Sequence, residues 1–299
     1  MGVAGSFDGD GPAVTTILDN PSVRPGGVLR GHVVVAAEED VTIDRAVLSL
    51  VTEVDGGFPI DFHRVAVAGP FAVLGGWGRT VPFSVPVPWQ TPVTHLPGRM
   101  VPAQPLPGAS VALRTDLTIT DVSDASYGVP VYVHPLPVQE RILDAFAGAG
   151  FGFRHSVLRR GRIPRVRQQV PLYQEIGLWP PSDYAGLVTE LEVIFLADPA
   201  GVDVILGLDR WANLVTHERP GVARFRVTHD VTATDWDRVV KGWVRDAVRG
   251  HATGHRGAQH PVPGPPGHSS LPPFERLADA DADCDRPEDG DTGRGDGAS

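Results

Sequence analysis

Arginines are concentrated in one short stretch of the sequence. Residues 154–167 contain six of them: Arg154, Arg159, Arg160, Arg162, Arg165 and Arg167. A guanidinium group is a planar fork of N–H donors that matches carboxylate and phosphate groups. The cluster, around an expected turn at Gly161, therefore predicts a binding patch for an acidic protein, an anionic lipid or a phosphate. Charges on solvated strand faces would give the same pattern, and this plainer interpretation is the more common one.

Catalytic and metal-binding motifs are the next chemistry to consider. The sequence has no G-x-S-x-G elbow, Walker loop, dinucleotide fingerprint or H-E-x-x-H helix. His251 and His255 have the spacing of a helical metal pair, but they lie in a glycine-rich stretch without a third ligand. The alternating aspartates of residues 279–285 resemble a calcium loop, yet Cys284 and Gly290 stand where such a loop needs glycine and glutamate. We therefore predict no catalytic residue, no metal site and no cofactor.

The charge of the chain narrows the class of partner. Its 299 residues include 26 Lys and Arg against 36 Asp and Glu, which gives a formal net charge of -10. Because nucleic acid repels an acidic chain, we expect protein partners and no nucleic acid. Acidic residues are frequent after Gly250. One further hypothesis is that this acidic tail folds back on the arginine cluster and competes with outside partners.

The composition also bears on where the protein works. Cys284 is the only cysteine, so this chain cannot form an internal disulfide or a cysteine-rich zinc site. The first residues lack the basic and apolar regions of a secretory signal. No apolar run approaches the length of a membrane span. We therefore expect a cytoplasmic protein.

Residues 13–134 have the pattern of a β-sandwich, preceded by a flexible N-terminus at residues 1–12. Short runs of β-branched residues alternate with polar ones and are separated by turn residues, and no convincing helix interrupts them. The expected strands are Ala13–Asp19, Val28–Ala37, Val41–Val54, Asp61–Val67, Thr80–Val87, Ser110–Thr120 and Tyr127–Val133. Prolines confine the strand at Thr80–Val87 to a sheet edge or to a domain boundary. The proline-rich stretch Leu96–Gly108 is expected to be a long surface loop.

A junction between two halves of the chain spans Val131–Phe153. The last strand of the first half stops at His134-Pro135, and apolar residues that include Ile142 and Phe146 then recur at helical spacing. Prolines open a helix and glycines end it, which places a short helix before Gly150. We expect His134, Pro135, Ile142 and Phe146 to form an interdomain connector that sets how the halves pack.

Residues 135–250 are predicted to contain the connector helix, a C-terminal β-sandwich and a terminal helix. The expected strands are Phe153–Leu158, Arg165–Leu178, Leu187–Leu196, Val202–Leu208 and Val222–Thr228. The terminal helix is expected at Asp235–Arg249, capped by Thr234, with an apolar stripe that includes Trp236 and Trp243. Such a stripe most often packs on a sheet, and peripheral contact with a membrane surface is the weaker alternative. Residues 251–299 are poor in aliphatic side chains, so we predict a disordered acidic tail.

Several short motifs occur along the chain: PFSVPVPWQTP at residues 82–92, LRG at 29–31, LSLVT at 48–52, HPL at 134–136 before the junction helix, GF at 150–151, PLYQE at 171–175, ELEVIF at 190–195 and LDR at 208–210. In their order and spacing these motifs resemble the bacterial sporulation-control family Spo0M, whose members have an arrestin-like fold. The resemblance covers residues 13–250. The chain departs from the family at residues 174–178, where QEIGL replaces an acidic-aromatic QEFEF stretch, in the Leu96–Gly108 loop and in the tail.

The resemblance implies an all-β fold, with two tandem arrestin-like β-sandwich domains, a short connector helix, a C-terminal amphipathic helix and a disordered tail. It also implies a non-enzymatic adaptor that acts in sporulation or developmental control through protein–protein contacts, with a link to cell division. A second hypothesis, from another class, is a carrier that holds a small ligand or lipid in the cleft between the two domains.

Overall fold

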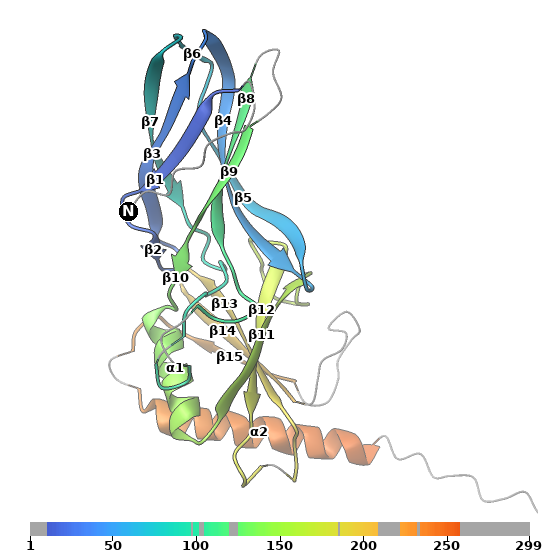
Figure 1. Cartoon of the computed structure of the whole chain (residues 1–299). Coiled ribbons are helices and arrows are strands. Elements are labelled where there is room, and N and C mark those ends of the chain that lie inside the picture. Colours follow the sequence, from blue (N-terminus) through green and yellow to red (C-terminus); the bar gives the residue numbers. More distant parts are fainter. Residues whose placement is uncertain are drawn as a thin grey trace, which may run out of the picture. The chain divides into compact units, whose positions relative to one another are not determined.

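The fold is built from strands, with one helix at the junction and one near the end (Figure 1). The structure is a computed structural model that describes residues 11–96, 98–101, 105–119, 125–184, 186–208, 222–231 and 234–257. The strands are β1 (Ala13–Leu18), β2 (Ser22–Val23), β3 (Val28–Ala37), β4 (Val41–Val54), β5 (Phe58–Ala68), β6 (Phe71–Val73), β7 (Trp77–Pro86), β8 (Ala112–Ile119), β9 (Ala125–Pro130), β10 (Tyr132–Val133), β11 (Gly152–Arg160), β12 (Leu172–Trp179), β13 (Leu191–Asp198), β14 (Gly201–Leu208) and β15 (Val222–Val227). The helices are α1 (Pro137–Gly148) and α2 (Trp236–Gly257).

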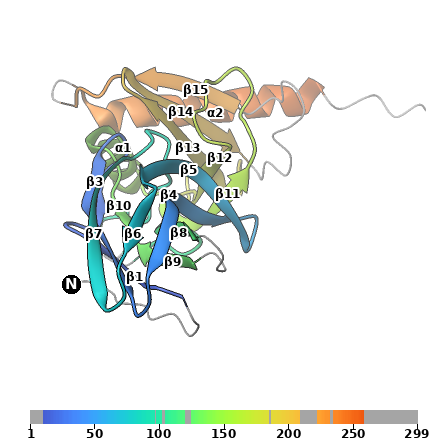
Figure 2. The ribbon, with the colours of Figure 1, turned by 90° about the horizontal axis from the view of Figure 1, so that it is seen from above.

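The N-terminal strands form two sheets that face each other (Figure 1 and Figure 2). One has the order β1-β3-β7 and the other β5-β4-β8-β9, with β6 beside β4. Alternate side chains of β3, β4 and β8 point between the sheets and are fully buried, among them Val33, Leu48 and Leu113. The hydroxyls of Thr16 and Thr115 join the two sheets through a hydrogen bond of 2.6 Å. These residues make the sandwich that the alternating pattern predicted.

Details of this sandwich agree with the sequence pattern where the pattern is long. β4 has the predicted bounds, and its pairing with β8 shifts register between Ile43 and Arg45, close to the irregularity expected at Asp44-Arg45. β7 is an edge strand, which is one of the two positions that its prolines allowed. The sequence analysis missed β2 and β6 because strands of two and three residues are too short to show a period.

The junction helix α1 lies where the sequence placed it. The backbone N–H of Leu136 donates to Oε1 of Gln139 at 2.7 Å, which satisfies a donor at the start of the helix. Ile142, Phe146 and the rest of the apolar stripe are fully buried. Gly150 follows with a φ of +87°, the left-handed conformation that ends helices.

The C-terminal half contains an antiparallel sheet in the order β11-β12-β13-β14-β15. Helix α2 packs on β14 and β15 and also contacts α1 (Figure 2). The Trp243 ring stacks on Phe225 of β15 with centroids 4.6 Å apart, and Trp236 packs edge-on against Trp243. The apolar stripe of the terminal helix therefore covers the sheet, and in this structure it is not available to a membrane surface.

Three predicted boundaries in this half are wrong. β12 begins at Leu172 rather than Arg165, because Arg165 has a φ of +61° and the chain before Leu172 forms a loop. The cap of α2 is Asp235, not Thr234, since its Oδ1 accepts the backbone N–H of Arg238 at 3.1 Å. Helix α2 continues to Gly257, beyond the predicted end at Arg249. The remainder of the predicted tail, residues 258–299, lies outside the described residues.

Replacing Phe146 by alanine should destabilise the protein strongly. Phe146 of α1 is fully buried, and the centroid of its ring lies 5.5 Å from that of Phe151. Removal of the ring therefore leaves a cavity at the junction. We expect the free energy of unfolding to fall by about 3–5 kcal/mol, measured by chemical denaturation. Leu74→Ala is the control, because Leu74 is 60% exposed and should change stability by less than about 0.5 kcal/mol. Equal effects of the two substitutions would contradict the packing described for α1.

Candidate functional site

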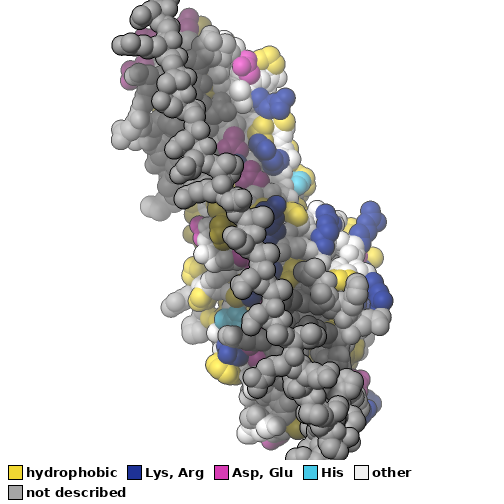
Figure 3. Space-filling view, turned by 90° about the vertical axis from the view of Figure 1, so that its right-hand side faces the viewer, with side chains coloured by type: hydrophobic (Ala, Val, Ile, Leu, Met, Phe, Trp, Pro, Cys, Tyr) yellow, Lys and Arg dark blue, Asp and Glu magenta, His cyan; other side chains and the backbone are white. Residues whose placement is uncertain are grey.

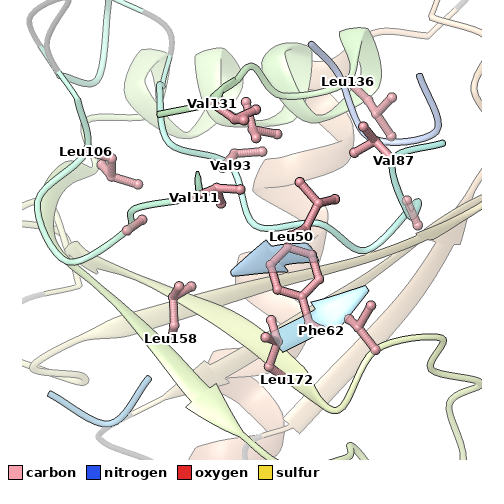
Figure 4. Close-up of a cluster of buried hydrophobic side chains, with 14 of the residues drawn as sticks. Leu50, Phe62, Val87, Val93, Leu106, Val111, Val131, Leu136, Leu158 and Leu172 are labelled. Atoms are coloured by element: carbon pink, nitrogen blue, oxygen red, sulfur yellow. The ribbon is translucent and has the colours of Figure 1, made fainter. Parts of the chain in front are cut away.

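A single hydrophobic core continues from the N-terminal strands into the C-terminal sheet (Figure 4). Leu50 and Phe62 of the N-terminal strands lie in the same cluster as Leu158 of β11 and Leu172 of β12. Leu106 lies there too, although the Leu96–Gly108 stretch was expected to be a surface loop. We call this contact region between the two halves the seam. Side chains that cross the seam hold the candidate binding surface in place.

The first polar link across the seam is the side chain of Gln174 in β12. Its Oε1 accepts the backbone N–H of Val93 at 2.9 Å, and its Nε2 donates to the Val93 carbonyl at 2.9 Å. Nε2 also donates to the hydroxyl of Ser156 at 3.0 Å. Buried backbone groups require hydrogen-bond partners. The side-chain amide of Gln174 supplies to Val93 the two hydrogen bonds that a neighbouring strand would otherwise provide.

The second link runs in the opposite direction, from the N-terminal half to the loop between β11 and β12. Nε2 of Gln90 donates to the Arg167 carbonyl at 3.0 Å, and Oε1 of Gln90 accepts the backbone N–H of Gln169 at 2.7 Å. Gln90 is itself buried. Both atoms of the amide are therefore used, and the loop is tied to the N-terminal half at two neighbouring residues.

A third link comes from the turn between β4 and β5. The backbone N–H of Asp55 donates to the Leu158 carbonyl at 2.9 Å, and the Asp55 carboxylate lies 3.7 Å from the Arg159 guanidinium. Asp55 adopts a φ of +50°, which non-glycine residues rarely do and which Asp tolerates better than most. The turn therefore reaches β11 and adds a backbone contact there.

The six arginines of the sequence cluster divide into two groups. Arg154 pairs with the fully buried Glu190 at 2.6 Å and lies over the Trp179 ring at 4.1 Å. Arg159 pairs with the buried Glu175 at 3.0 Å. Burial raises the pKa of Glu175, and the hydrogen bond from Arg159 opposes that rise. These two arginines neutralise buried carboxylates on the sheet.

The other four arginines lie at the last residue of β11 and in the loop that follows it, with their side chains exposed. We call residues 160–171 the arginine loop; the side chains of Arg160, Arg162, Arg165 and Arg167 are exposed on it. Figure 3 shows several Lys and Arg side chains on the face of the molecule that it presents. Of the six predicted residues, the structure therefore brings four together at the surface.

The buried side chain of Gln168 organises the arginine loop from inside. Its Oε1 accepts the backbone N–H of Ile163, and its Nε2 donates to the carbonyls of Leu172 at 3.3 Å and Gly161 at 3.4 Å. Arg162 donates to the Gln168 carbonyl at 2.9 Å. Together with the two bonds from Gln90, these contacts give the exposed arginines a fixed backbone.

The predicted connector residues meet the N-terminal half at β2. The backbone N–H of His134 donates to the Val23 carbonyl at 2.9 Å, and the Pro135 carbonyl accepts a hydrogen bond from Arg24. Arg24 also pairs with Glu140 of α1 at 2.8 Å. The His134 ring lies against the His95 ring, with centroids 5.0 Å apart and ring planes tilted by 35°. Burial, then the charges of His95 and Arg24, lower the pKa of His134, and Glu140 opposes them.

A pocket of about 370 Å³ opens at the seam next to the arginine loop. We call it the seam pocket; it is lined by Gly26, Phe62, His63, Pro86, Val87, Pro88, Trp89, Gln169 and Val170. The His63 ring hydrogen-bonds to the backbone of Pro86, which can only accept, and burial lowers the pKa of His63. Nε2 of His63 is buried and has no hydrogen-bond partner in the described structure.

Other kinds of site find no support in the described part of the chain. Among these residues, no three His, Cys, Asp or Glu side chains come close enough to hold a metal ion. No helix in the same ranges is both long enough and apolar enough to cross a membrane. The proposed contact between the acidic tail and the arginine cluster concerns residues outside the described ranges.

Sequence reasoning missed the glutamines Gln90, Gln168 and Gln174 and the seam pocket. Gln174 is the one with a visible signal, because it interrupts the apolar run of β12. A polar side chain inside a buried strand needs a hydrogen-bond partner. Its partner, Val93, is 81 residues away, and neither this distance nor the pairing is encoded in the local pattern.

The two facing N-terminal sheets, the junction helix and the five-stranded sheet after it define an all-β protein of the arrestin-like type. The family model of the SpoOM protein, Spo0M, matches residues 3–212. This match spans most of the chain, and the chain belongs to the Spo0M family.

Spo0M of Bacillus subtilis shows the same relationship in its sequence and in its crystal structure. The sporulation-control protein Spo0M of Bacillus subtilis is 27% identical over 209 residues, which are 67% of this chain and 76% of that protein. The crystal structure of Spo0M from Bacillus subtilis matches 81% of this chain and 99% of its own, with a TM-score of 0.67 and 23% identity. The structural match supports the fold, including the parts of the chain on both sides of the seam.

Replacing Gln174 by leucine should loosen the seam. Leucine keeps most of the volume but leaves the N–H and carbonyl of Val93 without the partners that Gln174 supplies. We expect a loss of about 2–4 kcal/mol in the free energy of unfolding, the cost of two unsatisfied backbone groups. Gln169→Ala is the control, because that side chain is exposed. A Gln174→Leu protein as stable as the control would contradict the link.

Acid should weaken the folded state partly through His134. Because its pKa is lowered in the folded protein, the unfolded chain binds a proton more readily. Stability is therefore fully present above the ordinary histidine value of 6.5 and falls as the pH drops below it. His134→Gln should reduce the drop in the thermal midpoint between about pH 7.5 and pH 5.5. Tyr132→Phe is the control, because it changes the ring that contacts His95 without removing a histidine, and its thermal midpoint should fall as much as that of the wild type. Equal falls in the wild type, His134→Gln and Tyr132→Phe would contradict the role given to His134.

Proposed function

We propose that this protein is a non-enzymatic cytoplasmic adaptor that binds an acidic protein partner through the arginine loop. The observation that carries the proposal is the fixed presentation of the loop. Its backbone is held by Gln168 from inside and by Gln90 from the N-terminal half, while four arginine side chains remain exposed. A loop that is already ordered loses less conformational entropy when it binds a partner. This favours a binding role for the exposed arginines over the interpretation that they are only solvated surface charges.

The charges on the loop define the chemistry of the partner. Arg160 and Arg167 have exposed side chains, and the side-chain hydrogen bond of Arg162 goes to a neutral carbonyl. Forked guanidinium groups bind carboxylates in two-point contacts. The chain as a whole has a net charge of -10, so the arginine loop is a local basic surface on an acidic protein. Its positive charge attracts an acidic partner to this loop, whereas acidic parts of the surface repel that partner.

The pathway in which the adaptor acts is proposed from its relatives. The Bacillus subtilis protein is a sporulation-control protein, and it shares most of its length with this chain. We extend that role to this chain as sporulation or developmental control. The alternative of a ligand carrier has the seam pocket in its favour, but about 370 Å³ is at the lower end of the range for small-molecule sites.

Reversing the loop charges tests this function. In Arg160→Glu/Arg167→Glu, neither substituted side chain takes part in the links that hold the loop, so the fold should persist. We expect partner capture from the native cell to drop by about tenfold or more, and sporulation frequency to fall with it. Arg30→Glu, an exposed arginine on β3, is the matched control and should behave as wild type.

Two results would contradict the proposal. The first is unchanged partner capture and sporulation in the double variant. The second is binding of the wild type, and not of the double variant, to vesicles of phosphatidylglycerol with no captured protein, because the arginine loop would then recognise lipid.

A further inference from the structure

An exposed apolar turn lies at the start of β7. Leu74 is 60% exposed and Trp77 is 71% exposed, and the backbone N–H of Trp77 donates to the Leu74 carbonyl at 3.0 Å. Gly76 takes a φ of +76° and Gly75 donates its N–H to Asp40 at 2.8 Å. The turn is therefore ordered, and it holds a large aromatic side chain in water, an arrangement that typically marks an interaction site.

Acidic residues surround this turn. Gly76 donates its backbone N–H to the Ala37 carbonyl at 2.8 Å, which places the exposed residues 38–40, Glu-Glu-Asp, beside it. Arg79, the nearest cation on β7, lies over the Phe71 ring at 4.6 Å. We call the turn and these acids, residues 74–77 and 38–40, the tryptophan tip. Its charge disfavours an anionic membrane and favours a basic protein surface.

The seam pocket has the complementary properties. Its walls include Phe62, Val87 and Trp89, and its volume of about 370 Å³ accommodates an indole ring. Positive charge lies next to it, because the exposed Arg167 of the arginine loop precedes the lining residue Gln169 by two positions. Nε2 of His63, a lining residue, is buried and has no hydrogen-bond partner among the described residues.

The tryptophan tip cannot reach the seam pocket of its own molecule. Trp77 begins β7 and Pro86, which lines the pocket, ends it. The ten residues of β7 run along β3 without a register shift, from Trp77 opposite Ala37 to Pro86 opposite Val28. At about 3.4 Å per residue, the two ends lie about 30 Å apart. Figure 1 shows the turn before β7 at the end of the N-terminal strands away from β11.

We propose that the tryptophan tip of one molecule docks into the seam pocket of a second copy of this chain. The contact is head-to-tail, because the two surfaces are different parts of the same chain. It leaves one free tip and one free pocket in every pair, so further copies can add. A single inserted aromatic with a charged rim makes a small interface, and such interfaces are weak and depend on concentration. The proposal does not rest on the adaptor function. The two share the arginine loop, because Gln169 and Val170 of that loop line the seam pocket.

Sedimentation velocity of the full chain over a concentration series up to about 1 mM covers the affinity range of such weak interfaces. We expect the wild type to associate progressively, and less so as the salt concentration rises. Trp77→Ser removes the tip and should be monomeric throughout. Leu187→Ser is the matched control, since Leu187 is 57% exposed elsewhere on the surface, and it should associate as wild type.

A mixing experiment separates head-to-tail docking from any other association. Gln169→Trp fills the pocket from its own chain and should also be monomeric, with the tip intact. Mixed with Trp77→Ser, it should form pairs and no larger species, because the mixture contains one usable tip and one usable pocket. Circular dichroism of both variants verifies that they fold. A monomeric wild type, association of Trp77→Ser equal to wild type, or a mixture that stays monomeric would each overturn the proposal.

Discussion

Irregular backbone is buried at the seam, and its hydrogen-bonding groups must find partners there. Two glutamine side chains supply them, Gln174 for Val93 and Gln90 for Arg167 and Gln169. An amide side chain carries one donor group and one acceptor group, as a peptide unit does, so it can pair with a backbone in the manner of a neighbouring strand. The shared hydrophobic core could slide without loss of apolar burial, whereas these paired hydrogen bonds fix one position.

The surface features follow from this constraint. The arginine loop is ordered because Gln90 and Gln168 hold its backbone, and its arginines stay exposed because the buried carboxylates on the sheet are already paired with Arg154 and Arg159. The seam pocket exists because the loop stands against Trp89 and the end of β7. One set of contacts therefore produces both the basic surface proposed for an acidic partner and the pocket proposed for a second copy.

The sequence predicted those parts of the fold that rest on a long, regular pattern. β4 repeats its apolar residues over 14 positions and α1 carries a complete helical stripe, so both were placed correctly. Gln168 shows why other parts were not predictable. The stretch RVRQQV before Pro171 was predicted to be part of a strand, whereas in the structure the buried amide of Gln168 bonds to both sides of a loop. The arginine cluster was visible as a composition, but its division into two groups depends on where β11 ends and on which buried carboxylates lie beside Arg154 and Arg159.

Native-state hydrogen exchange tests most directly whether the glutamine links make the two halves one unit. The amides of Val93 and Gln169 lie in irregular segments, which usually exchange through local opening. In this account both are protected by side chains across the seam, and they should exchange only with the global unfolding of the protein, like the amides of β4 and β13. Exchange of Val93 and Gln169 at the rate of exposed loops, while the strands on both sides stay protected, would show that the seam opens on its own and would contradict the account.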